Sequence, residues 1–173
     1  MADHQPNPVS TDLPRFSWRE LLVFKLIKFY PPYLGAGVEV THIAPDLTSI
    51  EVQMKLRFWN RNYVGTHFGG SLYSMCDPFF MIMLLMRLGR DYIVWDKAAT
   101  IRFLRPGRGT VTARFELPEA EVERVRRLAA TEPKVEPVYN VDVVDAQGDV
   151  VAKVEKVLYV RRKDRGRGAV GDG

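Results

Sequence analysis

The chain has 173 residues, 46% hydrophobic and 27% charged, which predicts one soluble globular domain with a hydrophobic core. Its single cysteine, Cys76, excludes an internal disulfide, and its three histidines lack any metal-binding spacing, so no metal site is expected. The formal net charge of +4 suits a small polyanionic ligand, whereas interspersed acids and bases without an aromatic RNA-binding motif argue against a nucleic-acid partner.

The N-terminal part predicts a flexible segment followed by a helix. Residues 1–16 are polar and rich in proline, without the basic start and apolar run of a secretory signal, which favours a cytoplasmic protein. Ser17 and Glu20 form a capping box, which predicts a helix over 17–30. Pro31 and Pro32 are expected to end that helix.

Two strands are predicted next, over 37–44 and 50–58. In the second, apolar residues alternate with charged or polar ones, so that one face of the strand is buried and the other is wet. The apolar positions are Ile50, Val52, Met54, Leu56 and Phe58.

A long apolar helix is predicted over 71–88, ending at Gly89. Pro78 cannot donate to the carbonyl of Ser74, so the helix is expected to bend or open there. Only residues 79–86 are continuously apolar, which is too short to cross about 30 Å of hydrocarbon, and no membrane partner is expected.

The remaining sequence predicts strands over 92–104 and 110–117, a helix over 119–130, and a hairpin of strands over 135–144 and 150–160. A helix that is apolar nearly all round must be buried on most sides. We therefore predict an α+β fold with an antiparallel sheet wrapped around the long helix, as one domain over 17–162. Residues 163–173 are predicted to be a disordered basic tail.

The start of the apolar helix carries the residues that suggest chemistry. Gly69 and Gly70 either ease a tight turn or let a ligand oxygen approach the free N–H groups of the first helical turn. Asp77 lies about two turns further on the same face, and is either a loop-capping or ion-paired acid or a catalytic carboxylate in a cleft. Asn62 either caps a turn or orients a water. Cys76 is more simply a packing residue than a nucleophile.

The pattern N-x-x-G-x-x-x-G-G-x-x-x-x-x-x-D, from Asn62 to Asp77, resembles the hotdog-fold acyl-CoA thioesterases, in particular the phenylacetyl-CoA-thioesterase-like group. The downstream T-I-R-F-L-R-P at 100–106 belongs to the same resemblance, which covers about residues 35–160. One position departs from it, because many relatives have a histidine directly before the two glycines. Here that position is Phe68 and the histidine, His67, comes one residue earlier. The F-G-G variant resembles a less characterised bacterial branch.

The resemblance implies a hotdog fold, a homodimer or a dimer of dimers, and an active site between subunits. It implies that Asp77 is the general base or nucleophile that hydrolyses an acyl-CoA, that the Gly70 N–H polarises the thioester carbonyl, and that Asn62 positions water or substrate. Coenzyme A would be part of the substrate, no cofactor is expected, and the setting would be fatty-acid metabolism. Substrate-binding candidates are Gly69, His67, Phe68, Ser71, Lys97, Arg102, Arg105 and Arg108.

One other function fits the sequence, and a second fits it less well. A non-catalytic hotdog module that binds acyl-CoA or a lipid-like ligand is favoured by the displaced His67. A hotdog dehydratase or hydratase would need a histidine paired with an acid, and no well-placed histidine is present.

Overall fold

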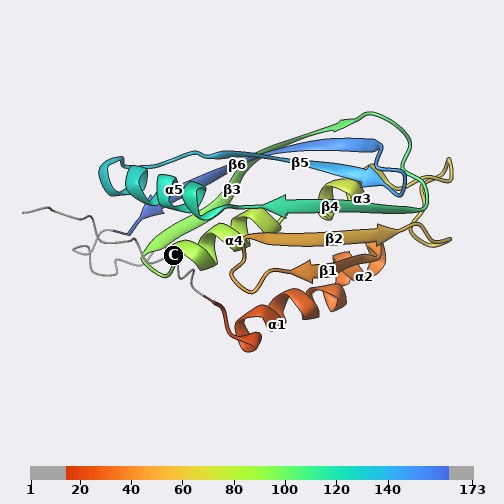
Figure 1. Ribbon diagram of the computed structural model, residues 1–173. Coiled ribbons are helices and arrows are strands. Elements are labelled where there is room, and N and C mark those ends of the chain that lie inside the picture. The colour runs from red at the N-terminus through yellow and green to blue at the C-terminus, as the bar shows by residue number, and fades with distance from the viewer. Residues whose placement is uncertain (1–14, 164–173) are drawn as a thin grey trace, which may run out of the picture.

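The computed structural model describes residues 15–163 and contains a six-stranded sheet with the order β1-β2-β4-β5-β6-β3 (Figure 1). Every pair of neighbouring strands runs antiparallel. The strands are β1 (Val38–Ile43), β2 (Ser49–Lys55), β3 (Tyr92–Phe103), β4 (Thr110–Glu116), β5 (Val138–Asp145) and β6 (Val150–Arg162). The predicted α+β hotdog arrangement is confirmed.

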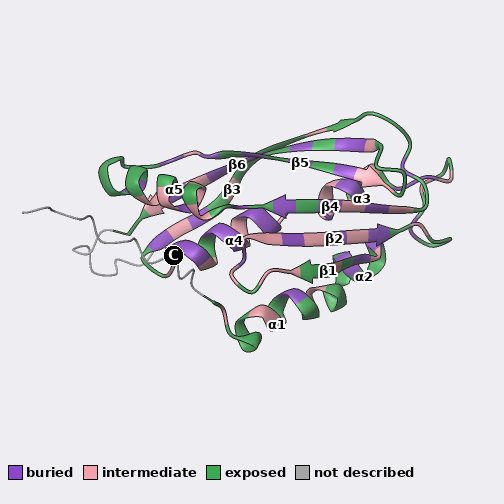
Figure 2. Ribbon diagram, viewed as in Figure 1, coloured by how far each residue is buried: buried purple, intermediate pink, exposed green. Residues whose placement is uncertain are grey.

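The predicted long helix is present as two helices, α3 (Gly69–Ser74) and α4 (Phe79–Leu88). The inner side of α4 is buried, and the rings of Phe79 and Phe80 lie 5.0 and 5.1 Å from the ring of Phe115 in β4 (Figure 2). The core of the molecule therefore lies between this helix and the sheet.

The break between α3 and α4 has an identifiable cause. Pro78 has no N–H to donate to the carbonyl of Ser74, so that carbonyl lacks its α-helical partner. The buried hydroxyl of Tyr33 donates to it instead, at 2.9 Å, and the N–H of Asp77 reaches it at 3.3 Å. The opening predicted at Pro78 is confirmed, and it separates the helix into two parts.

The period-two pattern of the second strand predicted its burial correctly as far as the strand extends. Ile50, Val52 and Met54 are fully buried. However, β2 ends at Lys55, so the prediction that Phe58 lies on the buried face is wrong. Phe58 is 78% exposed in the following turn, where it packs edge-on against Trp59.

The N-terminal region contains two helices rather than one. Ser17 and Glu20 form the predicted capping box of α1, but α1 (Trp18–Leu26) ends four residues early and continues as a 3-10 turn, Ile27–Phe29. Pro31 and Pro32, expected only to end a helix, begin α2 (Pro31–Ala36), because proline at a first helical position has no N–H bond to lose. Figure 1 shows both helices beside β1.

The C-terminal half follows the prediction closely. Helix α5 (Glu119–Thr131) buries Val122, Val125 and Ala129. Strands β5 and β6 form the predicted hairpin, although β5 begins at Val138 and Val135 pairs with Val160 only as an isolated bridge. The predicted flexible segment 1–16 and tail 163–173 lie, except for residues 15, 16 and 163, outside the described residues.

Taken together, Gly69–Leu88 span 20 residues and meet the length and composition of a membrane-crossing helix. Half of that stretch is buried inside this molecule against its own sheet. A core helix of a soluble protein meets the same two criteria, so the stretch is accounted for by the core.

Candidate active site

Asp77 lies in the break between α3 and α4, where the core helix opens. Its neighbours Cys76 and Phe79 are fully buried, yet its own side chain is 46% exposed. The break therefore presents a half-exposed carboxylate in the middle of a largely apolar stretch, Gly69–Leu88.

A buried lysine lies beneath this carboxylate. The Lys156 ammonium is 2.8 Å from Oδ1 of Asp77, 2.9 Å from Oδ1 of Asp96 in β3, and 3.3 Å from the hydroxyl of Tyr73. The Tyr73 hydroxyl also donates to Oδ1 of Asp77 at 2.7 Å. The Lys156 side chain has no exposed surface. Three polar side chains and one cation thus form a single connected cluster.

The electrostatics of the cluster keep Lys156 charged. Burial opposes the ammonium form, but the hydrogen bonds to Asp77 and Asp96 outweigh it and hold the pKa of Lys156 above its ordinary value. Burial raises the pKa of Asp96, with Lys156 acting in the opposite direction. Burial and the bond to Asp77 raise the pKa of the Tyr73 hydroxyl, so it stays protonated and able to donate.

Strand β6 places Lys156 in the core. Val154, Lys156, Leu158 and Val160 alternate along the strand, and all four are buried. The sequence analysis described this stretch as a strand and missed Lys156. The sequence contained a signal for it, because Lys156 falls on the apolar face of the alternating strand. Lysine is almost never fully buried unless it is paired, so its place there indicates a buried acidic partner.

Gly69 and Gly70 are the first two residues of α3. Neither has the positive φ that would require glycine. A Cβ on Gly69 would lie 2.9 Å from the ring of Phe103, and one on Gly70 would lie 2.4 Å from the ring of Phe68. Both rings belong to side chains that are more than half exposed. Backbone geometry therefore does not explain the glycine pair, and movable aromatic rings lie over the open first turn.

Asn62 and His67 serve the loop before α3. The Asn62 side chain accepts from the N–H groups of Val64 and Thr66 and donates to the hydroxyl of Thr66. His67 is buried, its Nε2 is 3.0 Å from the carbonyl of Gly109, and burial lowers its pKa, so the ring is neutral. Within one chain, both side chains hold the loop rather than contact Asp77.

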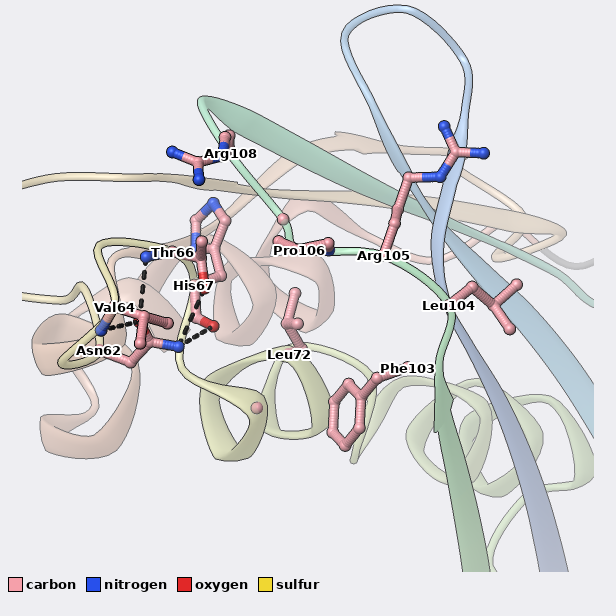
Figure 3. Close-up of a pocket in the computed structure, with 12 residues that line it drawn as sticks. Asn62, Val64, Thr66, His67, Leu72, Phe103, Leu104, Arg105, Pro106 and Arg108 are labelled. Atoms are coloured by element: carbon pink, nitrogen blue, oxygen red, sulfur yellow. Dashed lines mark hydrogen bonds between the residues drawn. The ribbon is translucent and has the colours of Figure 1, made fainter.

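A cavity of about 650 Å³ opens beside the start of α3 (Figure 3). Arg105 and Arg108 lie on either side of Pro106 at its rim. Its lining includes Asn62, His67, Gly69, Phe103, Arg105 and Arg108. Asp77 is not among the lining residues.

The other predicted binding residues lie elsewhere. Lys97 is paired with Glu136 at 2.6 Å, and Arg102 is exposed on β3 opposite Lys153. Ser71 is half-buried in α3 and does not line the cavity. Of the two predicted arginines Arg102 and Arg105, only Arg105 lines the cavity.

Metal binding and thiol chemistry are both unsupported among residues 15–163. No group of three or more histidine, cysteine or acidic side chains there could hold a metal ion. Cys76 is fully buried, and burial raises the pKa of its thiol to about 12, so it is a packing residue and not a nucleophile.

Strand β3 is an outer strand of the sheet and pairs on one side only, with β6. It is 12 residues long, and residues 97–100 are all exposed. A long, open edge without proline is a template for pairing with another chain. The same strand carries Asp96 beside the Lys156 cluster and Phe103 beside the cavity.

Comparison with protein families gives a match over most of the chain. A family described as a domain of unknown function, DUF4442, matches residues 19–160. The chain belongs to the DUF4442 family. No curated protein sequence matches this DUF4442 protein.

Solved structures similar to the DUF4442 chain include several proteins that are named as thioesterases. A Pseudomonas aeruginosa protein of unknown function, named a probable thioesterase, has a TM-score of 0.76 at 19% identity, covering 87% of this chain and 99% of its own. The Escherichia coli PaaI protein of the phenylacetic acid degradation operon has a TM-score of 0.55 at 22% identity, covering 81% of this chain and 91% of its own. A Streptococcus mutans protein bound to acetyl-CoA has a TM-score of 0.52 at 16% identity, covering 74% of this chain and 91% of its own. At such identities these similarities show a shared fold, the hotdog fold.

Proposed function

We propose that this protein is an acyl-CoA thioesterase whose active site forms between two copies of the chain. The observation that carries the proposal is Asp77, a half-exposed carboxylate at a helix break that accepts hydrogen bonds from Lys156 and Tyr73. Hotdog proteins named as thioesterases, and one solved with acetyl-CoA, support the substrate class.

The need for a second copy follows from distances within one chain. Asp77 comes seven residues after Gly70, about 10 Å along a helix, and it does not line the cavity beside Gly69. Pairing of two β3 edges would continue the sheet across a twofold axis, as antiparallel strands allow. Asp77 of one copy would then face the helix start and cavity of the other, in a dimer or a dimer of dimers.

The proposed reaction is hydrolysis of the thioester. Asp77 accepts a proton from water as the water oxygen attacks the thioester carbonyl carbon, and the Gly70 N–H of the second copy stabilises the oxyanion. The C–S bond then breaks, and the thiolate of coenzyme A takes up the proton from Asp77. In the variant mechanism, Asp77 attacks the carbonyl itself and water hydrolyses the acyl-enzyme. Coenzyme A enters as part of the substrate, and no cofactor is needed.

The rim of the cavity supplies cations for the phosphates of coenzyme A. Arg108 forms no ion pair with any residue of the described chain, and Arg105 pairs only with the exposed Asp149. The guanidinium fork matches phosphate geometry. We assign phosphate binding to these two arginines rather than to Arg102 or Lys97, which do not line the cavity.

A second candidate function is an acyl-CoA-binding hotdog protein without turnover. The observation that favours it is the neutral, loop-bound state of His67, which leaves Asp77 without a histidine partner among residues 15–163. A dehydratase, which needs a histidine and acid pair, is disfavoured by the same contact.

The experiment is thiol release from short, long and aromatic acyl-CoAs by wild type, Asp77→Asn and a control, Asp142→Asn. Asp77→Asn keeps the shape of the side chain and an oxygen for Lys156 and Tyr73, so it should fold normally. We expect its kcat to fall about 10²- to 10⁴-fold, the range of general-base catalysis, and the exposed Asp142 variant to keep full activity. Full turnover by Asp77→Asn would refute the site, and tight acyl-CoA binding without turnover by wild type would select the binding protein.

A further inference from the structure

The Lys156 cluster is more than the fold requires. Taking two charges out of water costs about as much as their attraction returns, and apolar residues of similar volume often serve a core equally well. Val154 and Leu158, which flank Lys156 on the same face of β6, show the kind of residue this position would otherwise hold. A role other than stability is therefore expected for the lysine.

The hydrogen bonds in the cluster treat the two oxygens of Asp77 differently. Lys156 and Tyr73 both donate to Oδ1, at 2.8 and 2.7 Å. No residue between 15 and 163 donates a hydrogen bond to Oδ2. Fixing Oδ1 by two donors sets the plane of the carboxylate and leaves the lone pairs of Oδ2 free.

We propose that Lys156 is a positioning residue of the thioesterase site, which together with Tyr73 holds Oδ1 of Asp77 so that Oδ2 is the oxygen that reacts. This inference rests on the proposed function and names the atoms of Asp77 that carry it out. Lys156 has no exposed surface, so it acts through Asp77 and does not touch the substrate.

The position of Lys156 makes it a rigid support. Strand β6 lies inside the sheet between β5 and β3, so the lysine backbone is held on both sides. Asp96 in β3 forms an ion pair with the ammonium at 2.9 Å and so limits the directions that the side chain can take. Asp77, by contrast, lies in the irregular turn between two helices and is half-exposed. A carboxylate on such a turn needs an external support to keep one orientation, and a misplacement of about 1 Å can cost about 10²-fold in rate.

The cluster also predicts how the reaction responds to pH. Without Lys156, two carboxylates, Asp77 and Asp96, would share a partly buried site with no cation, which disfavours their charged forms. The acidic limb of the pH–rate profile would then move to higher pH. The titratable groups facing Lys156 from the elements packed against it are Asp77, Tyr73, Cys76, Asp96 and Tyr139.

The test compares Lys156→Met with Lys153→Met, which removes an exposed lysine three residues earlier on the same strand. Each purified full-length variant is assayed for kcat, KM and the pH profile of kcat/KM with the best substrate of the panel. We expect Lys156→Met to lose about 10- to 100-fold in kcat, with KM changed less than about threefold and the acidic limb at higher pH. Lys153→Met should match wild type in all three, and Lys156→Arg should recover part of the lost kcat.

Tyr73→Phe provides a second test that does not depend on burial of a new side chain. It removes the other donor to Oδ1 and should lower kcat about 3- to 10-fold at unchanged KM. If wild type is active and Lys156→Met has an unchanged kcat and pH profile, this inference alone is overturned and the proposed function stands. If Lys156→Met does not fold, an unchanged kcat in Tyr73→Phe overturns it. Wild type without turnover would overturn the proposed function and this inference together.

Discussion

Substituting Gly70 by alanine separates two explanations of the glycine pair. If the pair only eases a turn, alanine should disturb folding; if it lets a thioester oxygen reach the backbone, alanine should disturb catalysis. Gly70 has no positive φ, so alanine can adopt the backbone conformation without strain. The three atoms nearest to the new Cβ all belong to the ring of Phe68, the closest 2.4 Å away, and Phe68 is 58% exposed.

The change in stability can be bounded from these contacts. Replacing glycine by alanine within a helix raises the free energy of unfolding by up to about 1 kcal/mol. Moving an exposed aromatic side chain off its rotamer costs about 0.5–1.5 kcal/mol. The two terms nearly cancel, so the free energy of unfolding of Gly70→Ala should lie within about 1 kcal/mol of wild type. The kcat should nevertheless fall about 10²- to 10³-fold, because the new Cβ would keep the thioester oxygen from the backbone N–H of residue 70, which is equivalent to losing one oxyanion donor.

The assay pairs urea unfolding with thiol release for Gly70→Ala, with Gly35→Ala as the matched control. Gly35 lies in α2, also without a positive φ, and a Cβ there would meet nothing within 4 Å. The control should be as stable as wild type or slightly more so, with full activity. A Gly70→Ala protein that is folded and fully active would refute the oxyanion assignment, and one that is unfolded would show that the glycine is structural.

Two further predictions concern stability. Tyr33→Phe removes the hydroxyl that donates to the Ser74 carbonyl and should lower the free energy of unfolding by about 1 kcal/mol. Thermal unfolding should show this as a drop in Tm of about 2–4 °C. Tyr30→Phe, at an exposed side chain, should change neither quantity. Burial lowers the pKa of His67, so below about pH 6.5 the unfolded chain binds more protons than the folded one. The free energy of unfolding should therefore fall as the pH drops through that value. His67→Gln should lose this part of the pH dependence, which urea titrations between pH 8 and 5 would measure.

The sequence predicted the sheet and the core well because both depend on local periodicity. Alternation in β2 located buried residues such as Val52 and Met54 correctly. Boundaries were less predictable where one side chain satisfies a distant backbone group. The helix that Pro31 begins could not be inferred from proline preferences alone, since proline both ends and starts helices.

The candidate site was half visible in the sequence. Asp77 stood out because it is an acid in an apolar helix, and motif spacing added Asn62 and Gly70. Lys156 and Asp96 did not stand out, because they are 79 and 19 residues away from Asp77 along the chain. Their contact depends on the register of β3 and β6, which only tertiary structure supplies. Pairing of residues so distant in sequence has no local signal.

The burial of Cys76 has a consequence for a protein that works beside a free thiol. Hydrolysis as proposed releases coenzyme A next to Asp77, one residue from the only cysteine of the chain. Mixed disulfides form through an accessible thiolate, and with a pKa of about 12 and no exposed surface Cys76 supplies almost none at neutral pH. The protein is thereby insulated from oxidative coupling to its own product. Colorimetric disulfide reagents can consequently follow product formation with the folded protein contributing no background.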